Sequence, residues 1–472
     1  MARWIDEVHL LEKSLRLLGE QFDHLPRIEE EVDVTVARPI LAEIAERLGD
    51  NFPYFHPFYL GQMLKPAHPI AKLAYQMALQ INPNNHALDG GRASSEMEKE
   101  AVADIAKMFG FNQHLGHLTS GGTFANLEAL WIAGREHPGK AIAASAQAHY
   151  THGRIADVLG LSFREIPYNS IGRLDLAALE ALLREGEVGT VVVTMGTTGF
   201  GFVEPLEDVV ALRKTYDFRL HVDAAYGGYF ILDEGLESEA ARHYSAICNA
   251  DSIVIDPHKH GLQPYGCGCI LFADPLIGRY YKHDSPYTYF VSNDLHLGEI
   301  SLECSRAGAS AVGLYATQKV FPLVKGGVFA ARLSCSRLAA QKLCDLVKAD
   351  KRFLTAWCPD LDIVVWLPSG ASATEISERS NRLFLSCAEQ DIHLALFEVP
   401  TSMISANHPE VFWDLETVTA LRACLMKPEH LQSMDEIWKR IDRAAESIQT
   451  IGDSHVAQAA CSQCKGNCSR NK

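Results

Sequence analysis

Short apolar runs rich in β-branched residues alternate with amphipathic helical stretches in this chain from about residue 96 to residue 272. The runs that we expect to form strands are 141–144, 162–166, 190–194, 219–222, 251–255 and 267–272. Helical periodicity, as in 205–216, separates most of them. This alternation favours an α/β fold in which a mainly parallel sheet is covered by helices. Too few residues separate the last two strands for a helical crossover, so we expect that pair to be antiparallel.

Two of the expected strands lead into ionisable side chains. Asp223 follows His221-Val222, and Lys259 follows the run Ser252-Ile253-Val254-Ile255-Asp256-Pro257-His258. Open α/β sheets bind ligands just beyond the carboxyl ends of their strands, so we expect the side chains of Asp223 and Lys259 to lie in one crevice. An ionisable group there needs a partner that offsets its desolvation. The pair predicts pyridoxal phosphate, bound to Lys259 as a Schiff base, with Asp223 keeping the ring nitrogen protonated.

A stretch of small residues precedes an expected helix over 124–135. It contains Gly121-Gly122-Thr123, where backbone N–H groups are free to approach an anion and the helix dipole adds to the attraction. The same tripeptide by itself is typical of a tight turn with a helix N-cap. Because it lies upstream of Asp223 and Lys259 within one α/β repeat, we interpret it as a phosphate cradle.

Polar residues follow two more of the expected strands. His149 comes after the strand 141–144, and a flat imidazole at that strand end is suited to stack on a planar cofactor, although a lone His is more often a cap or core residue. Thr197 and Thr198 come after the strand 190–194 and offer hydroxyl groups to the same space.

Five short motifs occur in an order and at separations that resemble one enzyme family. They are Gly-Gly-Thr, Ala-His, Gly-Thr-Thr, His-Val-Asp-Ala-Ala and Asp-Pro-His-Lys. The family is that of the fold type I pyridoxal-phosphate decarboxylases of the glutamate and aromatic amino-acid decarboxylase group (group II). The resemblance covers about residues 52–320 strongly and the remainder in outline. It implies a mainly parallel seven-stranded sheet covered by helices, with an N-terminal helical arm and a smaller α+β C-terminal domain.

The resemblance also implies roles for individual residues. Lys259 would carry the cofactor, Asp223 would pair with the pyridine nitrogen, His149 would stack on the ring, and the methyl of Ala225 would lie against its opposite face. Thr198 would lie near the ring substituents. The residues implied at the phosphate are Gly122, Thr123, Asp256 and His258.

The chain departs from the animal aromatic decarboxylases of this family around the lysine. It has Asp256 where they have Asn and His260 where they have Trp. An acid beside a phosphate is unfavourable unless it is neutralised or turned away. Archaeal tyrosine and aspartate decarboxylases are similar to this chain in having Asp-Pro-His-Lys. Family members also place a carbanion-protonating tyrosine in the loop after the lysine, for which we favour Tyr289 over Tyr287.

The sequence pattern predicts four segments. Residues 1–66 form a helical arm that is too short to bury its own core, and residues 67–320 form the large cofactor-binding α/β domain. Residues 321–455, with strands expected at 362–367 and 393–397, form a small α+β domain. Residues 456–472 are small and polar, which is typical of a disordered tail.

Composition excludes several classes of partner. The 472 residues carry a formal net charge of −16, which argues against nucleic acid and anionic membranes. No apolar run approaches the roughly 18 residues of a membrane span, and the N-terminus lacks a signal-peptide core, so we expect a cytoplasmic protein. The 12 cysteines are mostly isolated in apolar surroundings, as is typical of reduced core thiols.

Three thiols near the C-terminus have the spacing C-x2-C-x3-C. They are Cys461, Cys464 and Cys468, and no obvious fourth ligand follows them. A tetrahedral zinc site needs four ligands, so a solvated reduced tail is the favoured interpretation and no metal is expected.

The leading hypothesis is decarboxylation of an L-amino acid to the amine and CO2 through a Schiff base on Lys259. The alternatives are an aldehyde-forming oxidative decarboxylase, a carbon–carbon lyase, an aminotransferase that clamps its substrate with Arg382 or Arg422, and a non-catalytic pseudoenzyme. The family resemblance implies a homodimer whose active sites lie at the subunit interface. It also implies that Gln62 and the loop with Asn85 and His86 lie near the substrate pocket, where their polarity favours a polar or acidic substrate over an aromatic one.

Overall fold

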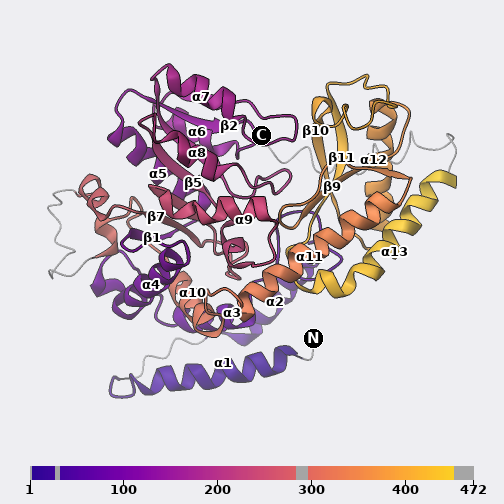
Figure 1. The fold of residues 1–472 in the computed structure, drawn as a ribbon. Helices are drawn as coiled ribbons and strands as arrows, with labels where there is room; N and C mark the ends of the chain where they lie inside the picture. Colours follow the sequence, from indigo (N-terminus) through magenta and orange to yellow (C-terminus); the bar gives the residue numbers. More distant parts are fainter. Residues whose placement is uncertain (1–2, 27–31, 283–295, 451–472) are drawn as a thin grey trace.

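The computed structural model of the chain describes residues 3–26, 32–282 and 296–450. Its larger sheet has seven strands in the order β1-β7-β6-β5-β4-β2-β3 (Figure 1). The strands are β1 (Leu115–Thr119), β2 (Ala141–Ser145), β3 (Phe163–Ile166), β4 (Val188–Thr194), β5 (Arg219–Asp223), β6 (Ser252–Ile255) and β7 (Gly268–Phe272). The run from β3 to β6 is parallel throughout, and β7 is antiparallel to both β6 and β1.

The predicted fold class is confirmed, including the antiparallel pairing of the last two strands of the repeat. The six strands expected from the pattern are present, but β1 was not identified from its residues. Its sequence, Leu-Gly-His-Leu-Thr, has a glycine and a buried histidine where a strand pattern would have β-branched residues.

Helices cover both faces of the larger sheet because successive strand residues point to opposite sides. On one face, Val191 and Val193 of β4 belong to a core that includes Ile105 of α4. On the other, Val192 packs with Leu130 of α5. The helices around this sheet are α4 (Leu88–Met108), α5 (Gly122–Glu136), α6 (Thr151–Val158), α7 (Leu176–Arg184), α8 (Leu206–Leu212), α9 (Ser238–Ser245) and α10 (Gly308–Val320).

A second, antiparallel sheet of four strands lies in the C-terminal part of the chain, in the order β10-β11-β9-β8. Its strands are β8 (Phe353–Leu354), β9 (Ile363–Pro368), β10 (Ala395–Pro400) and β11 (Thr417–Cys424). The accompanying helices are α11 (Val328–Ala349), α12 (Ala373–Glu389) and α13 (Glu429–Thr450). The sequence predicted β9 and β10 but missed β8 and β11. Buried Arg422 interrupts the apolar run of β11, and β8 has only 2 residues.

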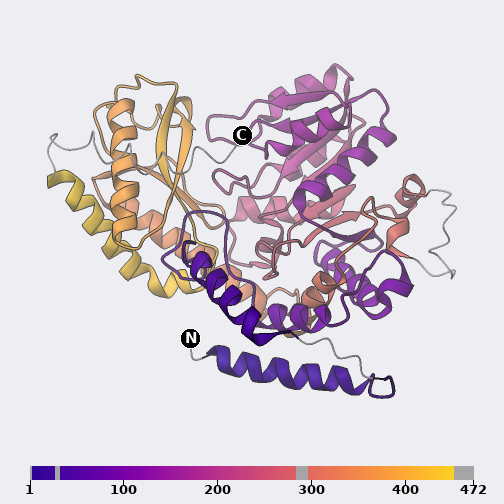
Figure 2. The same ribbon diagram turned by 180° about the vertical axis from the view of Figure 1, so that it is seen from behind.

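The N-terminal helices are α1 (Arg3–Glu20), α2 (Val34–Leu48) and α3 (Pro69–Leu79). In both ribbon views α1 runs along the outside of the molecule (Figures 1 and 2). Helix α2 buries none of its residues. Short 3-10 helices occur at Gly228–Leu232, Ile247–Asn249, Pro275–Tyr280, Leu297–Glu299 and Thr401–Met403. None of the described helices combines the length and the apolar character that crossing a membrane requires.

Candidate active site

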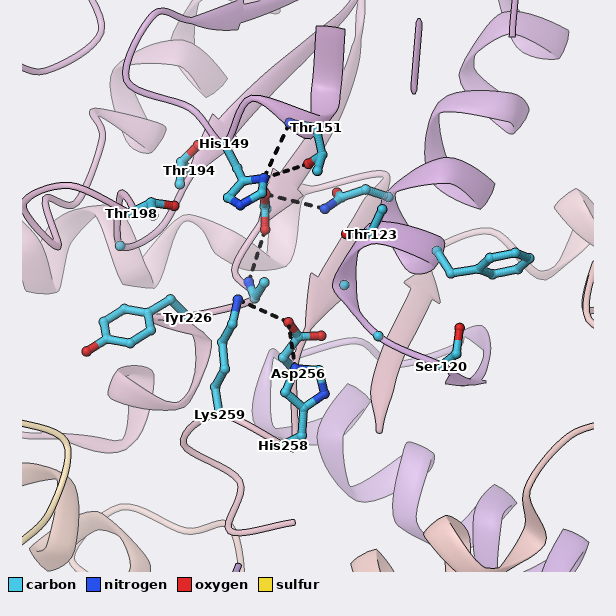
Figure 3. A pocket seen from close by; sticks show the side chains of 17 residues that line it. Ser120, Thr123, His149, Thr151, Thr194, Thr198, Tyr226, Asp256, His258 and Lys259 are labelled. Atoms are coloured by element: carbon cyan, nitrogen blue, oxygen red, sulfur yellow. Dashed lines mark hydrogen bonds and ion pairs between the residues drawn. The ribbon is translucent and has the colours of Figure 1, made fainter. Parts of the chain in front are cut away.

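A cavity of about 460 Å³ opens beyond the carboxyl ends of the central strands (Figure 3). Asp223 is the last residue of β5, and Lys259 lies four residues after the end of β6. The cavity brings together most of the residues that the sequence placed around the cofactor: Gly122, Thr123, His149, Thr198, Asp223, Ala225, Asp256, His258 and Lys259. The expectation for Thr197 was wrong, because this residue is buried outside the cavity and its hydroxyl accepts from Phe202 N at 3.1 Å. Parallel strands present their carboxyl ends at one edge of the sheet, which explains why residues so distant in sequence meet here.

Asp223 is buried and accepts hydrogen bonds on both carboxylate oxygens. Its Oδ2 lies 3.0 Å from His152 Nε2 and 3.4 Å from Asn126 Nδ2, and its Oδ1 accepts from the backbone N–H of Ala225 at 3.1 Å. Burial alone would raise the pKa of Asp223. The hydrogen bond from His152, together with the charge of Lys259 and the hydrogen bond from the Ala225 N–H, outweighs burial and holds the pKa of Asp223 well below its usual value. The carboxylate is therefore ionised and suited to pair with a protonated nitrogen.

Lys259 lies opposite a second carboxylate. Its Nζ is 3.1 Å from Asp256 Oδ2, and His258 Nε2 is 3.5 Å from the same oxygen. Burial lowers the pKa of His258, which favours its neutral form. The Asp256 carboxylate is thus paired with the lysine ammonium, so the acid in this position is neutralised within the chain.

The N-terminus of α5 faces the same cavity. Gly121 caps the helix without any side-chain hydrogen bond, and Gly122 and Thr123 line the cavity. A Cβ at Gly122 would lie 2.7 Å from Asp256 Oδ2, so only glycine allows the helix to approach that carboxylate so closely. This helix end offers backbone N–H groups and a favourable dipole to an anion.

His149 and Thr198 also line the cavity. Thr151 donates to His149 Nδ1 from its hydroxyl at 2.8 Å and from its backbone N–H at 3.3 Å. With Nδ1 accepting, we assign the ring proton to Nε2. Burial lowers the pKa of His149, so the ring is neutral near pH 7 and suited to stack on an aromatic group.

The structure adds cavity residues that the sequence analysis did not single out for the site. The residues of this kind are Phe124, Asn126, Thr151, Thr194, Gly196 and Tyr226. Asn126 lies one helical turn after Gly122 on α5, a spacing that could have suggested it. His152, which lies behind Asp223, is separated from it by 71 residues, and no local signal in the sequence connects the two.

A second cavity of about 350 Å³ shares His149 and Thr198 with the first. Gln62, predicted near the substrate, is in its wall, as are Gln147 and Arg422. The Arg422 guanidinium donates from Nε to Gly199 O at 2.9 Å and from Nη2 to Thr198 O at 2.6 Å. Arg382, on α12, lines neither cavity.

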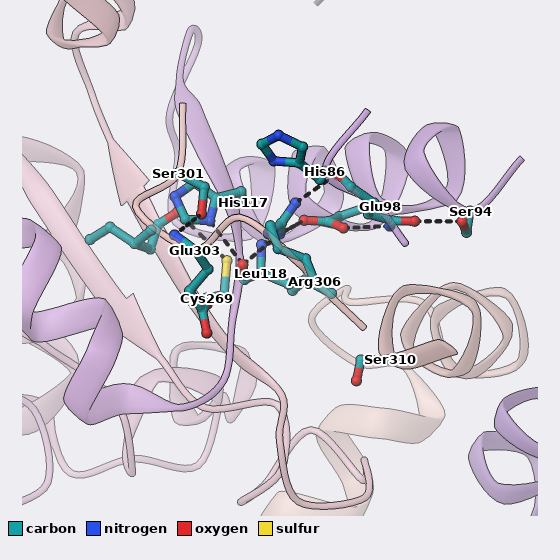
Figure 4. A network of polar contacts seen from close by, with 12 residues as sticks. His86, Ser94, Glu98, His117, Leu118, Cys269, Ser301, Glu303, Arg306 and Ser310 are labelled. Atoms are coloured by element: carbon teal, nitrogen blue, oxygen red, sulfur yellow. Dashed lines mark hydrogen bonds and ion pairs between the residues drawn. The ribbon is translucent and has the colours of Figure 1, made fainter. Parts of the chain in front are cut away.

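Asn85 and His86 line neither cavity within one chain. Asn85 is fully buried and donates to Glu98 Oε2 at 2.7 Å. It belongs to a polar network in which Arg306 pairs with the other oxygen of Glu98 (Figure 4). His86 lies at the edge of this network, where its carbonyl accepts from Gly298 N at 2.9 Å.

Some residues singled out in the sequence fall outside the described part of the chain. These are the loop tyrosines Tyr287 and Tyr289 and the C-terminal thiols Cys461, Cys464 and Cys468.

The donor set of the first cavity fits pyridoxal phosphate. An amine, an ionised carboxylate and an uncapped helix N-terminus match the aldehyde, the ring nitrogen and the phosphate of that molecule. His258 Nδ1 and Thr194 Oγ1 are buried and have no hydrogen-bond partner within the described residues, which leaves both available to a bound molecule.

Comparison with known proteins agrees with this geometry. The model of the pyridoxal-dependent decarboxylase conserved domain matches residues 52–366. A probable L-tyrosine/L-aspartate decarboxylase of Methanothermobacter thermautotrophicus is 29% identical, over 76% of this chain and 96% of that protein. An L-tyrosine decarboxylase of Enterococcus faecium is 28% identical, over 60% of this chain and 63% of that protein.

A solved structure shares the fold. The Oryza sativa TDC crystallised with PLP and tryptamine superposes with a TM-score of 0.75 at 18% identity, over 95% of this chain and 97% of that one. The family model covers most of the chain, and the cavity contains the groups that the cofactor requires. The chain therefore belongs to the pyridoxal-dependent decarboxylase family, and its cofactor is pyridoxal phosphate.

Proposed function

We propose that this protein removes the α-carboxylate of a free L-amino acid as CO2 and releases the amine. The observation that carries the proposal is that Lys259, Asp223 and the N-terminus of α5 share one cavity. When bound, pyridoxal phosphate withdraws electrons from the substrate carbon that loses CO2. The residues proposed to hold it are Lys259 at its aldehyde carbon and, around the ring and phosphate, Gly122, Thr123, His149, Thr198, Asp223, Ala225, Asp256 and His258.

In this proposal each side chain orients a group or holds a proton. The Asp223 carboxylate accepts a hydrogen bond from the ring N–H and so keeps the proton on that nitrogen. The neutral His149 ring packs against the cofactor and helps to orient the bond to the carboxylate, since decarboxylation is fast only when that bond is correctly aligned. Lys259 would hold the cofactor through Nζ, and Asp256, 3.1 Å from that atom, would orient it and stabilise a proton there. Tyr289, with Tyr287 as the alternative, returns a proton to the substrate carbon.

The second cavity supports a substrate with a polar or acidic side chain. Gln62 and Gln147, which carry amide groups, line this cavity together with His149. A site built to hydrogen-bond a polar group rejects analogues that lack it far more strongly than an apolar pocket rejects an extra group. Because Asn85 and His86 line neither cavity within one chain, any contact that they make with the substrate would have to come from a second copy.

The arrangement of Arg422 disfavours the aminotransferase alternative. A guanidinium can bind a carboxylate bidentately along its Nε and Nη2 edge or along its Nη1 and Nη2 edge. In this chain the first of these edges already donates to backbone carbonyls of the loop 198–199. Arg422 is thus engaged in joining β11 to that loop.

The proposed function is tested by incubating the holoenzyme with single amino acids and measuring both CO2 and the organic product. We expect amine and CO2 in equal amounts, with L-aspartate or L-glutamate preferred to L-tyrosine and L-tryptophan. A keto acid or an aldehyde as the main product would overturn the decarboxylase assignment. A preference for the aromatic substrates would overturn the substrate class alone.

The Lys259→Ala variant tests the attachment residue. After borohydride reduction and proteolysis, we expect the parent protein to yield a peptide with the cofactor on Lys259 and the variant to yield no labelled lysine. Labelling of another lysine in the parent would show that Lys259 is misassigned. A parent protein that does not bind the cofactor would favour the pseudoenzyme alternative.

We also propose that the protein is a homodimer in the cytoplasm. The apolar faces of the N-terminal helices support the dimer: Ile40 and Ile44 of α2 are 51% and 46% exposed, and no residue of that helix is buried. The nine described cysteines are free thiols, which suits a reducing compartment.

A further inference from the structure

His152 is fully buried and contacts the carboxylate proposed to pair with the cofactor ring. It is the second residue of α6, and its Nε2 lies 3.0 Å from Asp223 Oδ2. The residue before it, Thr151, donates a hydrogen bond from its hydroxyl to His149 Nδ1. The first turn of α6 therefore supports both His149 and Asp223.

The hydrogen on His152 can be placed from its surroundings. Its Nδ1 is buried and has no hydrogen-bond partner within the described residues. A protonated imidazole would bury that N–H without an acceptor, which is costly. The neutral form with its proton on Nε2 satisfies the contact with Asp223 without this cost. His152 is thus a donor to the carboxylate.

A neighbouring chain of hydrogen bonds orients the second donor to Asp223. Burial lowers the pKa of His221 to about 3, so its ring is neutral. Its Nδ1 lies 2.9 Å from Ser252 Oγ and its Nε2 lies 2.8 Å from Asn126 Oδ1. With Asn126 Oδ1 accepting from His221, the amide nitrogen of Asn126 points to Asp223. At 3.4 Å this contact is longer than that of His152.

We infer that His152 is a positioning residue that keeps the Asp223 carboxylate ionised and aligned, and thereby keeps the proton on the ring nitrogen of bound pyridoxal phosphate. The inference rests on the proposed role of Asp223. His152 acts through Asp223, because it does not line the cavity itself. The positive charge of Lys259 also stabilises the Asp223 carboxylate. Asn126 and the Ala225 N–H are the other hydrogen-bond donors to this carboxylate. His152 is the donor whose side chain can be changed without altering a residue of the cavity wall.

The test is ¹⁵N NMR of the holoenzyme reconstituted with pyridoxal phosphate labelled at the ring nitrogen. The chemical shift of this atom reports its protonation directly, independently of turnover. We expect a protonated nitrogen in the parent and a shift toward the unprotonated value in His152→Phe, which removes the donor but keeps a planar ring. Since hydrogen bonds to charged groups are strong, we also expect kcat to fall on the order of 10-fold or more, with a smaller change in KM. His152→Gln, which restores an N–H donor, should recover much of the protonated signal.

Two controls separate this inference from the proposed function. His243→Gln changes a buried histidine on α9, outside both cavities, and should leave the nitrogen signal unchanged. If His152→Phe does not fold, His152→Met removes the same donor with a more adaptable side chain. If a folded variant without the donor, His152→Phe or His152→Met, has the same ring-nitrogen chemical shift as the parent, the inferred role of His152 is wrong. The proposed role of Asp223 is unaffected by that result. An unprotonated nitrogen in the parent would overturn both.

Discussion

At the scale of single residues, Glu204 is a buried acid beside the cavity edge. It is fully buried and accepts the backbone N–H of Thr194 on Oε2 at 2.7 Å. Burial is the main cause that raises its pKa from 4.5 to about 7. The folded protein therefore holds a proton on Glu204 over a pH range in which the unfolded chain releases it. The resulting stability is complete below pH 4.5 and is lost as the pH rises to about 7.

We expect Glu204→Gln to reduce this pH dependence. The substituted amide still offers an oxygen to Thr194 N but does not ionise. Between pH 4.5 and 7 the free energy of unfolding of the parent should fall by about 3 kcal/mol more than that of the variant. Urea unfolding at several pH values measures the difference. Parallel curves for the two proteins would show that Glu204 does not titrate in this range.

At the scale of elements, the pair Glu98 and Arg306 connects α4, β1 and the segment before α10 (Figure 4). Glu98 lies on α4 and accepts Leu118 N of β1 at 2.9 Å, while Arg306 lies just before α10 and also donates to Leu118 O. Both side chains are almost fully buried. This pair holds the edge strand β1, which leads into the helix N-terminus at the cavity.

We expect Arg306→Met to destabilise the protein by roughly 3–5 kcal/mol, because it leaves the Glu98 carboxylate buried without its counter-charge. The double variant Glu98→Gln/Arg306→Met removes both charges and should cost less than the single one. Urea unfolding of the parent, the two single variants and the double variant gives the coupling free energy. Additive effects of the two substitutions would contradict the proposed charge pairing.

At the scale of the whole molecule, α2 presents an apolar stripe that no part of the described chain covers. Val36, Ile40, Ile44 and Leu48 recur at four-residue spacing, and each is at least 46% exposed. Contiguous apolar surface of this kind marks an interface. A second copy of the chain is the occupant that we propose.

We expect Ile44→Asp to weaken the dimer, because it places a charge in the apolar interface. The matched control, Ala42→Asp, introduces the same charge on the opposite side of α2 and should leave the dimer intact. Analytical ultracentrifugation over a range of concentrations measures both. Equal dimer stability in the two variants, or a monomeric parent, would rule out this helix face as the interface.

The sequence by itself determined the fold class and the set of residues that meet around the cofactor. Asp223, Lys259 and the glycines before α5 were predictable because each lies at the end of a strand or the start of a helix. The topology of an open α/β sheet gathers such positions at one edge. The strands rich in β-branched residues were predictable for a similar reason, since period and residue type are local properties.

Only the tertiary structure determined which side chains contact and orient the residues around the cofactor. The contact of His152 with Asp223 depends on how α6 packs against β5, and nothing within either segment specifies it. In the same way, packing of α4 against β1 places Asn85 next to Glu98, not in the cavity wall of its own chain. The strands β1 and β11 escaped prediction because buried His117 and Arg422 find their partners in other parts of the chain. Buried polar groups are stabilised by distant partners, and the identity of those partners is settled only when the elements pack together.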